Sequence, residues 1–327
     1  MNTLSVQDAF VAVAAGSAVL LLDGSTGYLV FAAERATTEL VAFAVRHSPG
    51  YLRVALPGTA CDRLDLPPVC PAPDARTPAY TVSVDAAHDI GTGISAADRA
   101  RTIRLLASAT TQPDELTRPG HVVAERVQDG GLLSRSGPAE AAADLARLAG
   151  LQHCGVVTEL VSPLDPCRIA NAIEVRAFAA QHGLAAVAVT DITAWRRDDE
   201  KWVEQVTSAR IPTEFGAFRA IGYRSTIDES EHVALVCGDT PFGTGEVLVH
   251  VHRECAAGDI FGSLACECRS RLREAMRTIA AHGRGVVLYL RSSEEASSAV
   301  TTQILTDLGI HSFAAAFALS HRVREPA

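Results

Sequence analysis

The sequence predicts an α/β fold divided into two domains near residue 200, and three observations support this prediction. The chain has 327 residues, which is enough for two domains of ordinary size. Short apolar runs alternate with helical patterns along the whole sequence. Hydrophobic residues make up 48% of the sequence but aromatic residues only 5%, so the cores must consist mainly of Ala, Val, Leu and Ile.

Apolar runs, alternation and capping residues predict the elements of the first half. The runs SAVLLL and YLVFAAE flank the turn sequence DGSTG, and AYTVSVDA alternates as a strand does. Ser95 is a candidate helix N-cap and Gly150 a candidate C-terminal stop. The predicted strands are 17–22, 28–34, 79–86, 154–160 and 184–191. The predicted helices are 36–47, 95–108, 138–150 and 172–183.

A charge run, WRRDDEKWV at 195–203, separates the two halves and is predicted to be a solvated connector. The second half then continues with a strand-rich pattern. Its predicted strands are 203–210, 215–223, 232–237, 246–252 and 285–291. One helix is predicted from the apolar spacing of Leu272, Ala275, Met276 and Ile279 and ends at Gly283. A last helix is predicted over 298–309.

Charge and composition exclude several classes of function. A net charge of −9 argues against a nucleic-acid surface, and no apolar run approaches the roughly 20 residues that span a bilayer. The N-terminal stretch lacks the basic start of a secretory signal, so we expect a cytoplasmic protein. Lys201 is the only lysine, which leaves no lysine elsewhere for a P-loop or a Schiff base.

Three cysteines lie close together in the second half, at Cys255, Cys266 and Cys268. In a reducing compartment, clustered cysteines bind metal or perform chemistry more often than they form disulfides. Three thiolates suit Zn²⁺ and leave a fourth position for water, as in catalytic zinc sites. Possible supporting or base groups near the first cysteine are His252, Glu254 and Asp259. The five scattered cysteines are predicted to be buried core residues: Cys61, Cys70, Cys154, Cys167 and Cys237.

The amino-acid sequence around these cysteines resembles that of a known family. VHVHRECAAGDIFGSLACECRSRLREAMRTIAAHGRGVVLYLR at 249–291 closely resembles the zinc segment of GTP cyclohydrolase II, and the stretches 210–223 and 232–239 resemble the first strands of that enzyme. The resemblance implies that Cys255, Cys266 and Cys268 are zinc ligands. That family opens the guanine ring of GTP and releases formate and pyrophosphate.

The first half resembles 3,4-dihydroxy-2-butanone 4-phosphate synthase. The resemblance is carried by FAAERATTELVAFAVRHSPGYLRVAL, YTVSVDA, TGISAADRARTIRLLA, RPGHV, EAAADLARLAG and GVVTEL. That family rearranges ribulose 5-phosphate, expels formate and uses Mg²⁺ or Mn²⁺. The two families together imply an α/β protein of the α+β type with two mixed-sheet domains. A synthase-like domain is expected at 1–200 and a shortened cyclohydrolase II-like domain at 201–327, and the synthase resemblance implies a homodimer.

The synthase resemblance also assigns roles to residues of this chain. His121 and Glu159 match positions that perform acid–base work, although a turn histidine and a strand-end carboxylate are ordinary alternatives. Arg135 matches a phosphate-binding position, and Ser95 and Asp98 match a substrate-facing turn. A plain helix cap explains Ser95 equally well.

Two expected ligands of the divalent ion are missing from the first half. The family carries an acidic loop, Asp-Arg-Glu-Asn-Glu-Gly-Asp, where this chain has DGSTG, about four residues shorter on a gapped comparison. The family histidine of Arg-x-Gly-His-Thr-Glu is replaced by Pro138, which offers no ligand atom. We therefore expect the Mg²⁺ or Mn²⁺ site, and with it the lyase activity, to be weakened or lost.

The second half departs from its family as well. The run Arg-Gln-Glu-Gly-Arg-Gly becomes Arg291 followed by SSEEASSAV, and Glu294 and Ala296 occupy the positions of the proton acceptor and the nucleophilic arginine. His250 replaces an expected arginine, and AFALSHRVREPA stands where a Thr-Asn-Asn-Pro stretch is expected. These changes predict negligible conversion of GTP.

Three functions remain open on the sequence. The chain could be an enzyme of riboflavin biosynthesis, which the match over nearly the whole chain favours. It could be a divergent enzyme for another sugar phosphate or nucleotide, which the retained Arg135, His121, Glu159 and cysteines favour. It could also be a non-catalytic relative that binds and regulates an active homologue, which erased catalytic positions within intact core patterns favour.

Overall fold

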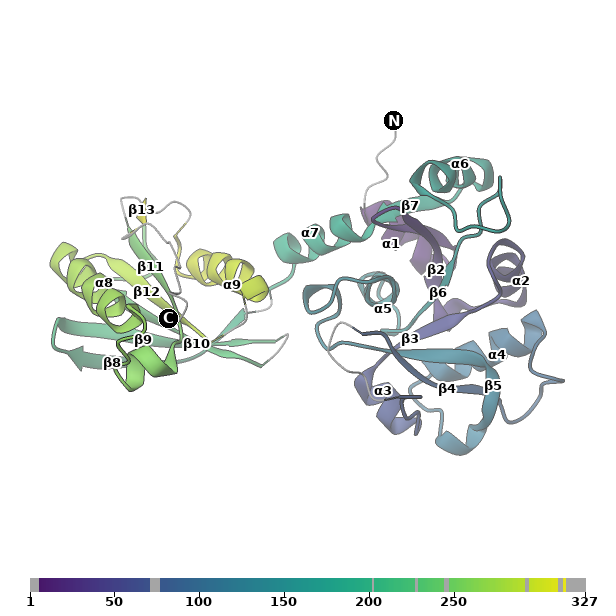
Figure 1. Ribbon diagram of the computed structural model, residues 1–327, viewed down its shortest axis with the longest axis horizontal. Coiled ribbons are helices and arrows are strands. Elements are labelled where there is room, and N and C mark those ends of the chain that lie inside the picture. Colours follow the sequence, from purple (N-terminus) through teal and green to yellow (C-terminus); the bar gives the residue numbers. More distant parts are fainter. Residues whose placement is uncertain are drawn as a thin grey trace. The chain divides into compact units, whose positions relative to one another are not determined.

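The computed structural model of the chain divides into two compact units, residues 1–199 and 200–327 (Figure 1). The residues that the structure describes are 6–70, 77–201, 203–226, 229–243, 247–291, 294–310 and 314–315. Each unit contains one mixed sheet with helices packed on it, so the predicted fold class of two mixed-sheet α/β domains is confirmed.

The first unit is built on a seven-stranded sheet in the order β4-β5-β3-β6-β2-β1-β7. The pairs β3–β5 and β1–β7 are parallel and the others antiparallel. The strands are β1 Val19–Asp23, β2 Thr26–Ala32, β3 Arg53–Pro57, β4 Ala79–Ala86, β5 Leu116–Val127, β6 Gly155–Glu159 and β7 Ala185–Ala188. The helices are α1 Val6–Ala14, α2 Thr38–His47, α3 Gly58–Arg63, α4 Ala96–Ala107, α5 Pro138–Leu148, α6 Ala172–His182 and α7 Val189–Asp199.

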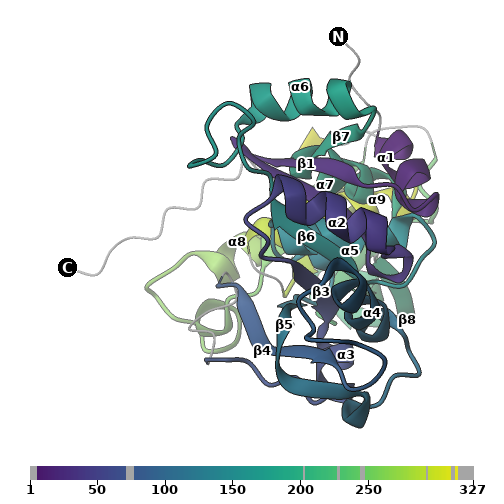
Figure 2. The ribbon, with the colours of Figure 1, turned by 90° about the vertical axis from the view of Figure 1, so that its right-hand side faces the viewer.

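Helices cover both faces of this sheet. One core cluster joins the sheet to α2, α4 and α6, and a second joins the opposite face to α1, α5 and α7. In Figure 2 the first unit faces the viewer, with α2 and α4 side by side in front of the sheet. Many of the buried side chains on α5 are alanines, which allow the helix to lie close to the strands.

Local sequence sets where these helices begin and end. Ser95 caps α4 as predicted, because its Oγ accepts a hydrogen bond from the Asp98 N–H at 3.1 Å. Asn171 forms a capping box at the start of α6, and Gly183 ends that helix in the left-handed conformation. The turn between β1 and β2 is short, so the two strands are paired from Val19 with Val30 to Asp23 with Thr26.

Two predictions at the end of the first unit are wrong. The predicted strand 184–191 stops at Ala188, and the predicted solvated connector contains the second half of α7. Arg196 is only 5% exposed, and its Nη1 lies 2.7 Å from both Asp144 Oδ2 and the Gly130 carbonyl oxygen. A charge run usually marks a solvated face, but here a buried carboxylate binds one of its arginines and holds α7 against α5.

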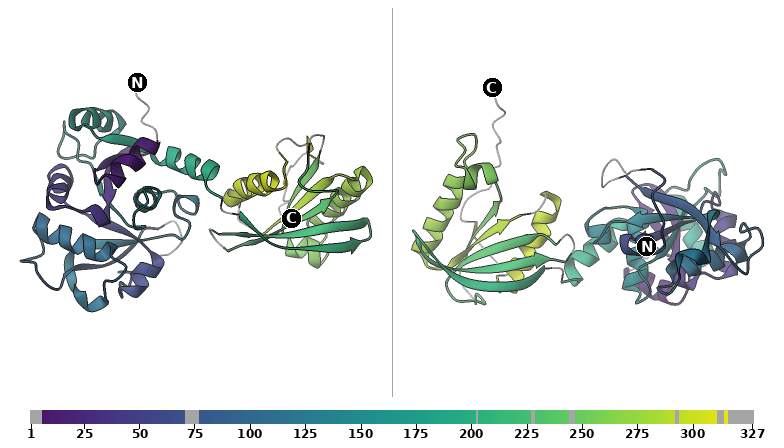
Figure 3. Two further views of the ribbon diagram at one scale, coloured as in Figure 1. Left: turned by 180° about the vertical axis from the view of Figure 1, so that it is seen from behind. Right: turned by 90° about the horizontal axis from the view of Figure 1, so that it is seen from below.

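The second unit is built on a six-stranded sheet in the order β13-β11-β12-β10-β9-β8. Its strands are labelled in Figure 1, and Figure 3 shows the ribbon from two further directions. The strands are β8 Val203–Thr213, β9 Gly216–Ser225, β10 Glu231–Cys237, β11 Leu248–Arg253, β12 Gly285–Leu290 and β13 Ala314–Ala315. The helices are α8 Cys268–His282 and α9 Glu294–Asp307. Parts of two stretches that were compared with family motifs lie outside the described residues. These are Ser292, Ser293 and residues 316–327.

The two helices cover opposite faces of this sheet. Phe218 of β9 packs with Ala275 and Ile279 of α8, whereas the Tyr223 hydroxyl of the same strand donates to Asp307 of α9 at 3.0 Å. Side chains alternate along a strand, so residues five apart point to opposite faces. Within the part of the chain that the structure describes, no helix has the length and apolar character needed to cross a bilayer.

We expect Gly120→Ala to destabilise the first unit by about 2 kcal/mol, because a β-carbon there would lie 2.0 Å from the Val84 carbonyl carbon on the neighbouring strand. The measurement is the midpoint of urea unfolding. Gly91→Ala is the control, since its β-carbon would meet only an ordinary contact at 3.5 Å. Equal midpoints for both variants would contradict the close approach of β4 and β5.

Candidate functional site

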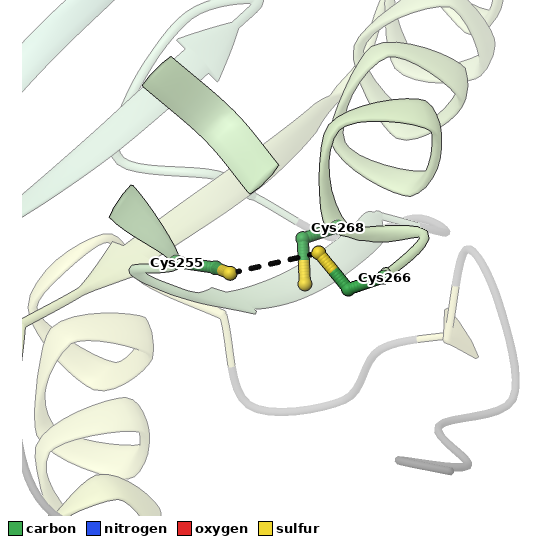
Figure 4. A group of neighbouring side chains, drawn as sticks. All are labelled: Cys255, Cys266 and Cys268. Atoms are coloured by element: carbon green, nitrogen blue, oxygen red, sulfur yellow. Dashed lines mark hydrogen bonds between the residues drawn. The ribbon is translucent and has the colours of Figure 1, made fainter. Parts of the chain in front are cut away.

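Three thiols converge in the second unit. Cys255 lies between β11 and a π-helical turn at Ala256–Ile260, Cys266 lies in the following loop, and Cys268 is the first residue of α8. Their sulfur atoms all lie within 4.8 Å of one another, and Figure 4 shows the three side chains gathered together. No other group of three His, Cys, Asp or Glu side chains within the described ranges meets this criterion.

The spacing of the thiols suits tetrahedral zinc. A Zn–S bond of about 2.3 Å places two sulfurs about 3.8 Å apart in a tetrahedron. The sulfurs of Cys255 and Cys266 are 3.7 Å apart. A β-carbon on Gly258 would lie 2.6 Å from the Cys266 sulfur, so only glycine allows the turn to approach the thiols this closely. The residues therefore fit a zinc ion with one coordination position left for water.

Ionisation of the thiols also indicates a cation. Burial and the neighbouring thiols raise the pKa of Cys268 to about 12, whereas the backbone N–H of Cys268 lowers the pKa of Cys266. Three thiolates cannot form side by side without a positive charge, and the thiolate is the form that binds metal. A divalent ion would supply that charge.

Asp259 organises the loop that carries the first thiol. Its Oδ2 accepts hydrogen bonds from the Cys255 backbone N–H at 2.9 Å and from the Tyr289 hydroxyl at 2.9 Å, and it lies 3.0 Å from His252 Nε2. Burial opposes ionisation, but these partners hold the pKa of Asp259 below its ordinary value. Glu254 instead pairs with Arg291 at 3.1 Å. Of the three predicted neighbours, His252 and Asp259 thus form one network behind Cys255, in the manner of groups that orient metal ligands.

His250 lies two residues before His252 on β11 and faces the same side of the sheet. It is 6% exposed, and its Nε2 has no hydrogen-bond partner among the described residues. Burial, together with repulsion from His252 and Arg271, lowers the pKa of His250 to about 4. The imidazole is therefore neutral near pH 7 and does not supply the positive charge of the arginine that the sequence analysis expected there.

Two of the predicted residues of the first unit, His121 and Glu159, lie toward the same end of the strands of its sheet. Arg53 of β3 is paired with Val123 of β5 and with Val157 of β6. His121 lies two residues before Val123, and Glu159 lies two residues after Val157. Because β5 runs parallel and β6 antiparallel to β3, both residues lie toward the same end of these strands. His121 Nδ1 is 2.7 Å from Asp85 Oδ2, and its backbone N–H donates to Asp85 Oδ1 at 3.0 Å. Asp85 thus fixes the orientation of the imidazole.

A buried ion pair lies at this end of the strands. Arg53 is 4% exposed, and its two terminal nitrogens bind different carboxylates. Nη1 donates to Glu125 Oε2 at 2.9 Å and Nη2 to Glu159 Oε1 at 2.6 Å. Burial raises the pKa of Glu125, and the attraction to Arg53 opposes this rise. Glu159, a predicted acid–base residue, is therefore bound to a guanidinium.

The other three predicted residues already have protein partners. Asp98 accepts hydrogen bonds from the Gly91 and Gly93 N–H groups at 3.2 and 3.1 Å, and Ser95 caps α4. Arg135 is 9% exposed, and its Nε lies 2.6 Å from Glu140 Oε1. Its Nη1 and Nη2 donate to the carbonyl oxygens of residues 77 and 126 at 2.9 and 3.3 Å. A phosphate-binding role for Arg135 stays a prediction that requires this guanidinium to change partners.

The positions expected to bind Mg²⁺ do not fit that ion. A hard divalent cation needs several oxygen ligands. Pro138 begins α5 and contributes no ligand atom from its side chain, and the β1–β2 turn supplies only Asp23 as a carboxylate. Because Tyr28 pairs with Glu159, this turn and Glu159 lie at the same end of the strands. Glu159, however, already accepts a hydrogen bond from Arg53.

Three charged residues of this region were not predicted from the sequence: Arg53, Glu125 and Asp85. Each is buried, at 4%, 3% and 6% exposure. The signal was present in the sequence, because each is a charged residue within a strand whose buried neighbours are apolar. Among the scattered cysteines, Cys61 and Cys154 are buried as predicted, whereas Cys70 and Cys167 are exposed and that prediction is wrong for them.

Family models match both halves of the chain. The model described as 3,4-dihydroxy-2-butanone 4-phosphate synthase matches residues 7–195, and the model described as GTP cyclohydrolase II matches residues 204–322. The riboflavin biosynthesis protein RibBA of Rhodococcus jostii (strain RHA1) is 52% identical over 298 residues, covering 89% of this chain and 72% of that protein. RibBA of Nocardia farcinica (strain IFM 10152) is 53% identical over 296 residues, covering 89% and 71%.

Solved structures of 3,4-dihydroxy-2-butanone 4-phosphate synthases are also similar to this chain. The crystal structure of RibBX, a two-domain 3,4-dihydroxy-2-butanone 4-phosphate synthase from A. baumannii, has a TM-score of 0.75 and 28% identity. The aligned region covers 98% of this chain and 95% of the RibBX chain. A 3,4-dihydroxy-2-butanone 4-phosphate synthase in complex with two magnesium ions has a TM-score of 0.55 and 37% identity. The aligned region covers 60% of this chain and 97% of that synthase chain.

We expect His250→Phe to reduce the acid sensitivity of the fold. Below pH 6.5 the unfolded chain takes up a proton that the folded His250 accepts only near pH 4, so stability falls as the pH drops through this interval. This one group contributes a slope of up to about 1.4 kcal/mol per pH unit. Urea unfolding between these pH values measures it, with the exposed His88→Gln as the control. A variant slope equal to that of the wild type would contradict the neutral burial of His250.

Proposed function

Because the chain belongs to the 3,4-dihydroxy-2-butanone 4-phosphate synthase and GTP cyclohydrolase II families of riboflavin biosynthesis, we propose that it keeps the zinc site of the second family and has lost the metal-dependent lyase site of the first. In this proposal residues 1–200 form a synthase-like domain that binds a phosphorylated sugar of the ribulose 5-phosphate class. Residues 201–327 form a shortened cyclohydrolase II-like domain whose conversion of GTP is weak or absent.

The convergence of Cys255, Cys266 and Cys268 is the observation that carries the zinc proposal. When bound, zinc would supply a Lewis acid with one open position. The protein's own contribution is to fix the three sulfurs, to hold Asp259 against the Cys255 backbone, and to keep His252 and Tyr289 on that carboxylate.

Loss of the lyase activity is supported by Pro138, by the short β1–β2 turn and by the ion pair of Glu159 with Arg53. Enolisation of a ketose requires its carbonyl to be polarised, and a divalent ion is the usual means of doing so. His121 held by Asp85, together with the partly exposed Glu159, remains able to bind sugar hydroxyls. These residues support binding better than they support turnover.

Weak conversion of GTP is supported by the sequence at the start of α9. Glu294 and Ala296 occupy the positions of the family's proton acceptor and nucleophilic arginine, and both belong to the first turn of that helix. Alanine has no atom that can attack phosphorus. His250, neutral and buried, replaces the second expected arginine.

Two alternatives differ from this proposal in what they predict. Identity above 50% to riboflavin biosynthesis proteins favours an active pathway enzyme, in which another carboxylate such as Asp23 takes over metal binding. Intact cores beside altered sites favour a non-catalytic relative that binds an active homologue. A homodimer and a cytoplasmic location belong to the proposal in either case.

We expect the purified chain to contain about one zinc ion, and Cys266→Ser to contain almost none. Asp259→Asn should weaken zinc affinity by about 10- to 100-fold, because the carboxylate positions Cys255 without touching the metal. Elemental analysis gives the content and competition with a chromophoric chelator gives the affinity. The exposed Cys167→Ser is the matched control. Equal zinc content in Cys266→Ser and the control would exclude the trio as the site.

We expect formate release from ribulose 5-phosphate with Mg²⁺ to be at least about 100-fold slower than in a family member with intact metal ligands. We also expect no diaminopyrimidine product from GTP. Robust Mg²⁺-dependent formate release would establish the active pathway enzyme instead. Stable co-purification with an active synthase, without turnover by this chain alone, would favour the non-catalytic relative.

A further inference from the structure

We infer that Arg53 is a built-in counter-ion for the first unit's ligand site, so that this site works without a divalent metal. The inference rests on the proposed function for the class of ligand, a phosphorylated sugar, and goes beyond it by assigning the positive charge of the site to one side chain. Arg53 acts through Glu159 and is therefore a positioning residue rather than a catalytic one.

The geometry of Arg53 is that of a bridging cation. One guanidinium joins Glu125 of β5 and Glu159 of β6, with N···O distances of 2.9 and 2.6 Å. The Arg53 and Glu125 side chains are 5% and 4% exposed, whereas that of Glu159 is 27% exposed. The buried end of the pair is thus fixed, and the Glu159 carboxylate is the part that solvent or a ligand can reach.

Charge balance explains why a metal is unfavourable here. Without Arg53, the sheet would place two carboxylates close together in a poorly solvated site, which is an arrangement that attracts a divalent ion. With Arg53 the group carries one net negative charge, and each carboxylate already binds a cation. A metal at Glu159 would have to displace a guanidinium that is buried and cannot lose its proton.

Tyrosines complete the site. Of the five tyrosines in the chain, Tyr28 is paired with Glu159 on the neighbouring strand and Tyr80 with Glu125, and Tyr51 lies beside Tyr80. The rings of Tyr51 and Tyr80 lie 6.4 Å apart, edge to face. None of the three phenol groups donates a hydrogen bond to another described residue, whereas Tyr223 and Tyr289 donate to aspartates. Phenols beside a held carboxylate suit a ligand rich in hydroxyl groups.

Manganese binding by the full, zinc-loaded chain tests the counter-ion directly. Mn²⁺ titration followed by electron paramagnetic resonance should give the same stoichiometry for the wild type and for Glu159→Gln, because no metal binds at Glu159. Arg53→Met should gain about one Mn²⁺ per chain, and the double variant Arg53→Met/Glu159→Gln should lose it again. A wild-type Mn²⁺ ion that Glu159→Gln abolishes would overturn the inference, even if Arg53→Met fails to fold.

Calorimetric titration with ribulose 5-phosphate separates this inference from the proposed function. The affinity should agree within about twofold in Mg²⁺-containing and Mg²⁺-free buffer, and Arg53→Lys should weaken it by about tenfold because an ammonium cannot bridge both carboxylates. Arg126→Lys, which alters a surface pair with Asp62, is the matched control and should bind as the wild type does. Binding only with Mg²⁺ would overturn the inference. Absence of binding in both buffers would remove the sugar phosphate from the proposed function, and the manganese result would decide the counter-ion alone.

Discussion

Buried charge must be compensated inside the protein, and this constraint shapes the first unit. Four arginines are almost completely buried there, and three of them pair with a carboxylate: Arg53 with Glu125 and Glu159, Arg135 with Glu140, and Arg196 with Asp144. The fourth, Arg99, donates to the Gly50 carbonyl oxygen. Removing one partner of such a pair leaves a buried charge uncompensated, at a cost of about 3–5 kcal/mol. These pairs therefore fix which strands and helices can lie next to one another.

The two units solve the same electrostatic problem in different ways. In the second unit three thiols lie within 4.8 Å of one another, and no arginine or lysine is bonded to their sulfur atoms among the described residues. In the proposed zinc site a metal ion would supply this positive charge, and Asp259 holds the loop that carries Cys255. In the first unit a guanidinium lies between the carboxylates, and the positions that would hold a metal carry Pro138 and a short turn. A fixed cation gives charge without Lewis acidity, so in the proposed first-unit site it would support ligand binding rather than metal-dependent turnover.

Sheet pairing makes both sites possible. β3 lies between β5 and β6, so residues far apart in the sequence, at 53, 125 and 159, meet across adjacent strands. In the second unit, β11 and β12 run parallel, and Tyr289 of β12 can therefore reach the carboxylate that holds Cys255. Substitutions at these positions change the chemistry of a site while the apolar faces of the same strands keep the fold.

The sequence by itself determined the fold class, most helices and strands, and the thiol trio, because alternation, caps and close cysteine spacing are local signals. It also predicted that two metal ligands are missing, at Pro138 and in the β1–β2 turn. Tertiary structure alone decided that Arg196 is buried, that Arg135 already has protein partners and that Arg53 binds Glu159. Each of these depends on residues between 5 and 106 positions apart in the chain, and whether such side chains are solvated or paired follows from strand order and helix packing rather than from local pattern.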